Sequence, residues 1–294
     1  EERFDKANIA CNTLRKSASE HYALYDSNLH EKELFAEKLI DEMDKALAQK
    51  QFKVVYQPKF NIKGEEPRLC SAEALVRWQH PELGMISPGL FIPLFEEHGL
   101  ISRLDDYIWR DVARQIRDWK NRFGTAVPVS VNVSRIDLLS QGFEEKMADI
   151  VRGNELQTSD MLLEITESAY TDSSDRIIDI AHSLRSRGFK LEMDDFGSGY
   201  SSLNMLAALP IDALKLDMKF VRNICGNAKD LRMVQLMIEI ASFLNVPVIA
   251  EGVETKEQYL LLKENNCDII QGYYFSKPLF VEQFSELIAK QGGK

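Results

Sequence analysis

The sequence predicts an α/β fold: a TIM-like (β/α)8 barrel preceded by N-terminal helices. Eight short apolar, strand-like runs follow one another between residues 52 and 276, and helical periodicity follows most of them. Near-continuous apolar strands alternating with helices are typical of a parallel sheet covered by helices. Eight such repeats within about 240 residues favour a closed barrel. Neither GxGxxG nor GxxxxGKS/T occurs, which weakens the alternative of a nucleotide-binding open sheet.

The individual elements follow from changes in periodicity along the chain. The expected strands are residues 52–60, 69–78, 127–134, 161–168, 190–197, 213–220, 247–254 and 268–276. The expected helices between and after them are residues 104–123, 143–156, 174–187, 230–244, 256–264 and 281–289.

The first fifty residues have a different pattern. Residues 1–21 and 31–51 both predict amphipathic helices, with a short strand-like piece at 21–26 between them. We therefore divide the chain into a helical linker or tail, residues 1–50, and a barrel, residues 51–294. Because the chain opens at Glu1 rather than at a methionine, we expect it to be a fragment of a longer protein.

Composition narrows the classes of function. The 294 residues carry a formal net charge of −10, which argues against binding to a nucleic-acid polymer. No apolar run approaches the length of a membrane helix, and no signal peptide is visible, so we expect no membrane contact by this fragment. Its four cysteines are scattered and form no CxxC pair, as in a cytoplasmic protein with reduced thiols. Membrane attachment of a longer protein is left open.

Polar residues interrupt seven consecutive predicted strands, the second to the eighth, and always late in the run. Charged groups are costly inside an apolar strand unless they are paired or bind a metal. In a barrel the carboxyl ends of the strands converge on one face, where such enzymes carry their active sites. These residues should therefore meet around one acidic pocket: Glu73, Asn132, Glu164, Asp194, Asp195, Lys215, Asp217, Glu251 and Gln271.

Five or more carboxylates in one pocket need positive charge to offset their repulsion. All the candidate ligands are oxygen donors, which suits Mg²⁺ or Mn²⁺. The adjacent acids Asp194 and Asp195 suggest two ions, because each can hold one. Paired metals serve the in-line hydrolysis of phosphate esters, and Lys215 would add a fixed cation beside the developing charge.

Simpler interpretations apply to single residues. One acid in an apolar run is most often an ion-pair partner or a strand-end residue facing solvent, but seven strands in register make this improbable for the whole set. For Asp217 and Glu254, a structural role and direct ligation stay equally open. The segment DDFGSGYSS fits an ordinary turn as well as a flexible loop over the pocket.

Residues from about 51 to 287 resemble the EAL domain of cyclic di-GMP phosphodiesterases. The resemblance rests on YQPKF, EALVRW, SVNVS, LLEITES, DDFGSGYSS, LKLD, AEGVET and QGYYFSKPL, in this order and spacing. Two departures are mild: no arginine follows LKLD, and DDFGSG stands where DDFGTG is commoner. Residues 1–30 faintly resemble the end of a GGDEF domain, without the GGDEF signature.

The resemblance implies hydrolysis of cyclic di-GMP to linear pGpG with two Mg²⁺ or Mn²⁺ ions, a first strand antiparallel to the others, and a homodimer. It assigns metal ligation to Glu73, Asn132, Glu164, Asp194 and Asp195. Catalytic roles fall to Glu251 as metal-associated residue or general base, to Lys215 as the group that orients water, and to Glu167 as anchor of the DDFGSGYSS loop. Substrate contacts are Gln57, Arg77, Asp217 and Gln271.

Two other functions remain as alternatives. A non-catalytic cyclic di-GMP receptor would be expected to lack metal ligands or the base, whereas all of them are present here. A barrel lyase or aldolase would use Lys215 to form a Schiff base. That chemistry needs a neutral amine, and the surrounding carboxylates should keep Lys215 protonated.

Overall fold

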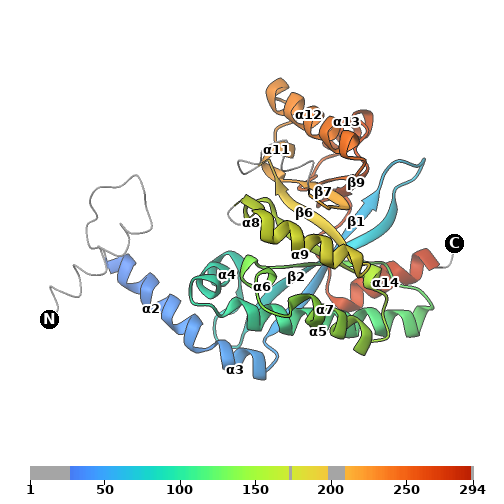
Figure 1. Cartoon of the computed structure of the whole chain (residues 1–294). Coiled ribbons are helices and arrows are strands. Elements are labelled where there is room, and N and C mark those ends of the chain that lie inside the picture. The colour runs from blue at the N-terminus through green and yellow to red at the C-terminus, as the bar shows by residue number, and fades with distance from the viewer. Residues whose placement is uncertain (1–26, 172–173, 198–208, 293–294) are drawn as a thin grey trace. The chain divides into compact units, whose positions relative to one another are not determined.

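The computed structural model describes residues 27–171, 174–197 and 209–292. The helix expected at 1–21 and the strand-like piece at 21–26 lie outside these residues. Figure 1 labels most of the helices and strands, which are numbered in chain order. The strands are β1 (Phe52–Asn61), β2 (Arg68–His80), β3 (Gly84–Ile86), β4 (Val129–Asn132), β5 (Met161–Thr166), β6 (Lys190–Phe196), β7 (Ala213–Leu216), β8 (Val248–Ala250) and β9 (Ile269–Gln271).

Helices follow most strands, as the periodicity predicted. They are α2 (Ser27–Asp41), α3 (Met43–Ala48), α4 (Pro88–Glu97), α5 (Ile101–Phe123), α6 (Arg135–Leu138), α7 (Phe143–Gly153), α8 (Glu167–Thr171), α9 (Ser174–Ser186), α11 (Met218–Val221), α12 (Ala228–Leu244), α13 (Lys256–Glu264) and α14 (Val281–Gly292), with a 3₁₀ turn at Thr158–Asp160. The single helix expected over 31–51 is instead two helices, α2 and α3, separated at Glu42.

Eight of these strands close into the predicted barrel. Their order is β1-β9-β8-β7-β6-β5-β4-β2, and β1 pairs with β2 to complete the ring, while β3 extends β2. Every neighbouring pair from β2 through β4 to β9 is parallel, whereas β1 runs antiparallel to β9. The antiparallel first strand that the resemblance implied is therefore confirmed.

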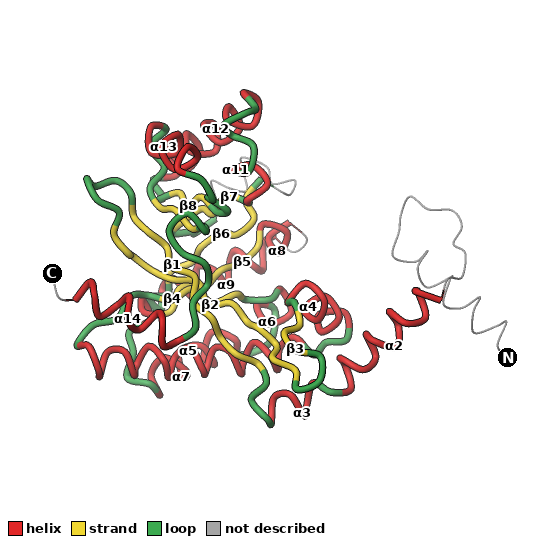
Figure 2. The backbone as a smooth tube through the Cα atoms, turned by 180° about the vertical axis from the view of Figure 1, so that it is seen from behind, coloured by secondary structure: helices red, strands yellow, loops and turns green. Residues whose placement is uncertain are grey.

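Successive side chains of the strands alternate between an apolar side that faces the helices and a side that faces the barrel interior. Val131, Leu163, Met193 and Leu214 are fully buried. Their side chains alternate with the polar ones of the site and so point outward, toward the helices that lie around the strands in Figure 2. The residues next to them point to the opposite side, into the barrel, because successive side chains of a strand alternate. The helices supply apolar stripes to match, for example Val112, Ile116 and Trp119 on α5, all without exposed surface.

The chain divides into two compact units. The first comprises residues 1–53 and 77–101, so β3 and α4 group with α2 and α3. An aromatic cluster holds this unit together: the ring of Phe52 lies 4.9 Å from that of Trp78 and 5.7 Å from that of Phe91. The second unit, residues 54–76 and 102–294, contains most of the barrel and is where the candidate site lies.

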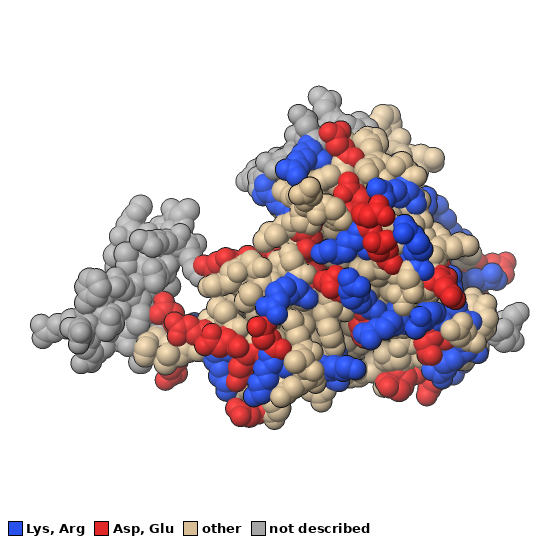
Figure 3. Space-filling model, turned by 60° about the horizontal axis from the view of Figure 1, so that its bottom comes forward, with Lys and Arg blue, Asp and Glu red and all other residues tan. Residues whose placement is uncertain are grey.

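The surface carries both signs of charge. On the face shown in Figure 3, lysine and arginine side chains are interspersed with aspartate and glutamate. Several form ion pairs one helical turn apart, such as Arg110 with Asp106 on α5. No helix within the described ranges is both long enough and apolar enough to cross a membrane.

Candidate active site

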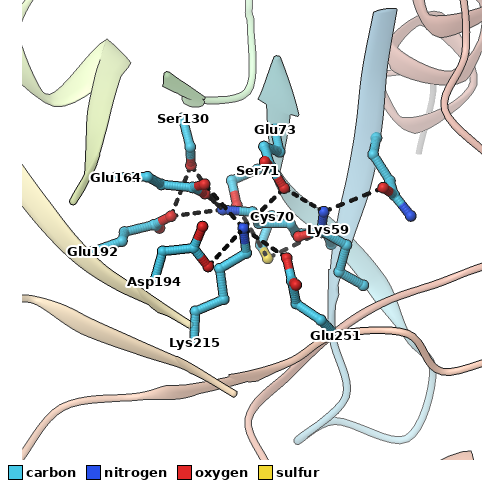
Figure 4. A network of polar contacts seen from close by, with 12 residues as sticks. Lys59, Cys70, Ser71, Glu73, Ser130, Glu164, Glu192, Asp194, Lys215 and Glu251 are labelled. Atoms are coloured by element: carbon cyan, nitrogen blue, oxygen red, sulfur yellow. Dashed lines mark hydrogen bonds and ion pairs between the residues drawn. The ribbon is translucent and has the colours of Figure 1, made fainter. Parts of the chain in front are cut away.

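The polar residues at the carboxyl ends of the strands meet inside the barrel, around the ammonium group of Lys215. Its Nζ lies 2.6 Å from Glu251 Oε1, 2.9 Å from both Glu73 Oε2 and Glu164 Oε2, and 3.3 Å from Asp194 Oδ1 (Figure 4). Only 1 % of the lysine is exposed. Acids from four strands or strand ends, up to 178 positions apart between Glu73 and Glu251, thus converge on one cation.

Glu73 is held by three donors. Besides Lys215, Gln271 donates from Nε2 to Glu73 Oε2 at 2.6 Å, and Asn132 donates from Nδ2 to Oε1 at 3.3 Å. Gln271 also donates to Gln57 at 3.3 Å, while its buried Oε1 has no hydrogen-bond partner among the described residues. A buried acceptor without a partner is unusual, and here it leaves one group ready for a ligand or water.

Protonation differs sharply among these neighbours. Burial raises the pKa of Glu73 and of Asp194, and the other acids add to the effect. The pKa of Glu251 is raised to about 8 by burial, although Lys215 acts against this. Burial alone would also raise the pKa of Glu164. The positive charges of Lys215 and Lys59 have the larger combined effect, so the pKa of Glu164 is lowered. Burial disfavours the charged form of Lys215, yet its four acidic neighbours outweigh burial and hold its pKa well above the usual value.

A pocket of about 290 Å³ opens above this cluster. Its lining includes Gln57, Glu73, Asp194, Lys215, Glu251 and Gln271. A larger hollow of about 900 Å³ lies by Val248, at the start of β8, and thus at the amino-terminal end of the strands. Barrel enzymes place their chemistry at the carboxyl ends, so the smaller pocket is the candidate active site.

Gly272 lets two backbones approach beside the pocket. It follows Gln271 directly, and a Cβ at this position would overlap the backbone of Val253. Only glycine tolerates such an approach. The glycine thereby sets how closely the end of β9 packs against the segment after β8, and with it where Gln271 lies.

Three predicted site residues have surroundings that differ from those of the residues in contact with Lys215. Asp195 adopts a left-handed φ of 55° beside a register shift in β6, which re-aims its side chain relative to Asp194. Asp217 caps α11, accepting from the Lys219 backbone N–H at 2.9 Å and pairing with Lys219 Nζ at 3.1 Å. Arg77 lies on the part of β2 that belongs to the first unit. Ligation by Asp195 and substrate contacts by Asp217 and Arg77 stay predictions.

Glu167 lies at the start of α8, immediately after β5, with 1 % of its surface exposed. Its Oε2 accepts a hydrogen bond of 2.9 Å from the backbone N–H of Gly197. Gly197 follows β6 with a φ of 93° and is the last described residue before position 209. The expected contact between Glu167 and the DDFGSGYSS segment is therefore present at Gly197, while residues 198–202 of that segment lie outside the described residues.

A second polar layer, which the sequence pattern did not predict, lies beneath the first. Lys59 on β1 and Glu192 on β6 are both buried, and their side chains form an ion pair of 2.6 Å. Lys59 lies two residues from Gln57, and Glu192 lies two residues from Asp194. Spacing by two along a strand puts side chains on the same face. This spacing was the available signal, because it extends the polar interior one layer below the pocket.

The charge and the donor atoms of this cluster can be compared with those that a metal ion requires. Four carboxyl groups (Glu73, Glu164, Asp194 and Glu251) surround Lys215, and a fifth, Glu192, pairs with Lys59, so five acids face two ammonium groups. In the described part of the chain, no three acidic, histidine or cysteine side chains are grouped so that they could hold a metal. Lys215 lies at the point where the acids converge. Oxygen donors are the type of ligand that suits a hard divalent cation such as Mg²⁺ or Mn²⁺, but the lysine occupies the position between them in this arrangement. Metal binding therefore stays a prediction.

The fold and the site together define an α/β barrel whose polar pocket lies at the carboxyl ends of its strands, the arrangement typical of barrel enzymes. Residues 40–278 match the family model described as "EAL domain". Because this match covers most of the chain, the protein belongs to the EAL domain family. The family that the sequence resembled is thereby confirmed; the remnant of a GGDEF domain stays a prediction.

Curated relatives and solved structures agree with this assignment. The chain is 36 % identical over 248 residues to the cyclic di-GMP phosphodiesterase NbdA of Pseudomonas aeruginosa, covering 84 % of this chain and 31 % of that protein. It is 34 % identical over 273 residues to the cyclic di-GMP phosphodiesterase PdeR of Escherichia coli, covering 93 % of this chain and 41 % of PdeR. The structure described as "PaMucR Phosphodiesterase, c-di-GMP complex" matches with a TM-score of 0.80 and 32 % identity, over 84 % of this chain and 99 % of that one. The chain spans less than half the length of these two curated relatives.

Proposed function

We propose that this chain is a cyclic di-GMP phosphodiesterase, which hydrolyses one phosphodiester bond to give linear pGpG with two Mg²⁺ or Mn²⁺ ions. The observation that carries the proposal is the cluster of acids around a protonated Lys215 at the floor of the pocket. Family membership supports the substrate, since relatives named as cyclic di-GMP phosphodiesterases cover the same residues.

The metal ligands in this proposal are Glu73, Asn132, Glu164, Asp194 and Asp195. When bound, the ions would lower the pKa of water and offset charge on the phosphate. The excess of acids over lysines favours such ions. Burial is the main cause of the raised pKa values of Glu73 and Asp194, and repulsion from the neighbouring acids, which a bound cation would relieve, adds to it.

In this proposal Glu251 and Lys215 have separate roles. Glu251, with a pKa near 8, can accept a proton at its carboxylate around neutral and mildly basic pH. Lys215 stays protonated and donates hydrogen bonds, which suits the orientation of a water molecule or of a phosphate oxygen. A protonated lysine also disfavours the Schiff-base alternative, which needs the free amine.

The direct test is incubation of the chain with cyclic di-GMP and Mn²⁺, followed by separation of the nucleotides by chromatography. We expect stoichiometric conversion to linear pGpG. Tight binding of cyclic di-GMP in Mn²⁺ with no product would contradict the proposal and favour the receptor alternative.

A further inference from the structure

Lys59 is a fully buried lysine that none of the roles above uses. Its Nζ lies 2.6 Å from Glu164 Oε1, 2.6 Å from Glu192 Oε2 and 2.7 Å from the hydroxyl of Ser130 (Figure 4). All three contacts are with side chains of other strands: β4, β5 and β6. The ammonium group therefore has three partners, on three parallel strands, across the barrel from β1.

Glu164 is consequently held from two sides. Lys59 binds its Oε1, and Lys215 binds its Oε2 at 2.9 Å. The two lysines take different oxygens, so the plane of the carboxylate is fixed and rotation about its last bond would break both contacts. Oε2 is the oxygen on the side of Lys215, which lines the pocket. Lys59 thus determines which oxygen of Glu164 meets Lys215.

A layer of side chains below the pocket supports this arrangement. Ser130 lies two residues before Asn132, and Glu192 two residues before Asp194. Because β1 runs in the opposite direction, Lys59 lies two residues after Gln57, and its Cα partner across the sheet is Gln271. Ser130 donates a further hydrogen bond of 2.8 Å to Glu192 Oε2. The layer is closed: each member is bonded to another member or to Glu164.

Stability alone does not account for this layer. A buried ion pair is often no more stabilising than apolar groups of the same size, because the desolvation of both charges offsets their attraction. The groups that orient metal ligands and catalytic side chains, by contrast, typically affect function by about 10- to 100-fold. The direct contact with Glu164, a predicted metal ligand, therefore favours a role in function.

We propose that Lys59 is a positioning residue: from beneath the pocket, together with Glu192 and Ser130, it fixes the carboxylate of Glu164 in the orientation that the reaction needs. The inference rests on the proposed function, since it concerns the same pocket. It adds the side chains of β1, β4 and β6 that lie one layer deeper.

The test compares three variants with the wild type. Lys59→Met removes the charge at nearly constant length but leaves Glu192 without its partner. Lys59→Met combined with Glu192→Leu removes both charges and leaves an apolar pair. Lys53→Met is the matched control, because Lys53 lies on the same strand and is exposed. Each protein is assayed for its melting temperature, its Mn²⁺ affinity by calorimetry, and kcat and KM with cyclic di-GMP.

For the double variant we expect a melting temperature within a few degrees of the wild type, Mn²⁺ binding weaker by about 10- to 100-fold, and a similar fall in kcat. KM should change by less than about threefold, because Lys59 does not line the pocket. Wild-type Mn²⁺ affinity and kcat in a folded double variant would overturn the inference. If the double variant does not fold, the same two criteria apply to Lys59→Gln.

The outcome for the wild type separates this inference from the proposed function. A wild type that neither binds Mn²⁺ nor hydrolyses cyclic di-GMP would refute the proposed function itself. A wild type that does both, with a double variant indistinguishable from it, would refute only the role of Lys59.

Discussion

Lys215 and Glu251 are direct neighbours whose pKa values move in the same direction for different reasons. Four acids hold the pKa of the lysine up, while burial raises that of the glutamate to about 8. Their contact of 2.6 Å therefore changes from one between a charged and a neutral group to an ion pair as the pH rises past 8. A carboxylate that can take up a proton near neutral pH, beside a permanent cation, is the combination that general-base catalysis needs.

Replacing Glu251 with Gln tests this role. The amide keeps the size of the side chain but cannot accept a proton, so we expect kcat to fall by about 10²- to 10⁴-fold. In metal-free buffer at pH 8 its melting temperature should equal or exceed that of the wild type, because one acid has left a crowded site. Loss of activity together with a collapsed melting temperature would instead assign Glu251 a structural role.

At the scale of elements, one side chain joins the end of β5 to the end of β6. Glu167 starts α8 and accepts from Gly197, which follows β6 and the acids Asp194 and Asp195. A φ of 93°, together with close contacts to Met237 and Phe220 that a Cβ would cause, explains why glycine stands there. The residue after β5 thereby restrains Gly197, two positions after the second of the two acids.

Replacing Glu167 with Ala should weaken the metal response more than it weakens the fold. We expect the half-saturating Mn²⁺ concentration to rise by about tenfold, since groups that orient ligands have effects of this size. The unfolding free energy should fall by at most about 1–3 kcal/mol, the usual cost of a fully buried donor left without its acceptor, because Gly197 is only partly buried. Metal titrations of activity and thermal unfolding supply the two quantities.

Glu167→Gln is the matched control, because its amide oxygen can still accept from Gly197 N–H. It should titrate with Mn²⁺ like the wild type. An activation curve for Glu167→Ala that overlays the wild-type curve would refute the role as loop anchor.

At the scale of the whole molecule, the order of strands and helices could be predicted from periodicity, and the convergence of the acids from the barrel rule. The break between helices α2 and α3 could not be predicted, because the apolar spacing continues through Glu42. Asp217 shows a second limit: an acid that ends a strand-like run can equally cap the next helix, as it does in α11. Lys59 and Glu192 fall outside the predicted set for different reasons: Lys59 lies on the first strand, whereas the set covers the second to the eighth, and Glu192 lies early in its run.

The buried acids also make a prediction for the stability of the metal-free protein. Between the ordinary pKa of a glutamate, 4.5, and about 8, folded Glu251 holds a proton that the unfolded chain has released. Stability therefore falls as the pH rises through this window, by up to about 1.4 kcal/mol per pH unit for each such group. Glu73 and Asp194 act in the same direction. Glu164, with its lowered pKa, contributes stability that is lost only at pH values below this window.

Denaturant unfolding in chelator from pH 5 to pH 8 measures this dependence. The unfolding free energy should decline steadily, and Glu251→Gln should flatten the decline. A free energy that rises with pH over the same range would show that these acids are ionised and compensated in the folded protein.

The measurement that tests the central claim most directly is hydrolysis of cyclic di-GMP by the wild type after exhaustive chelation and after return of single metals. The acid-rich pocket predicts no turnover in chelator, recovery with Mg²⁺ or Mn²⁺, and inhibition by Ca²⁺, which binds oxygen donors with longer, looser coordination. Full conversion to pGpG in chelator would contradict the account, because the acids around Lys215 would then act without the cations that their excess charge requires.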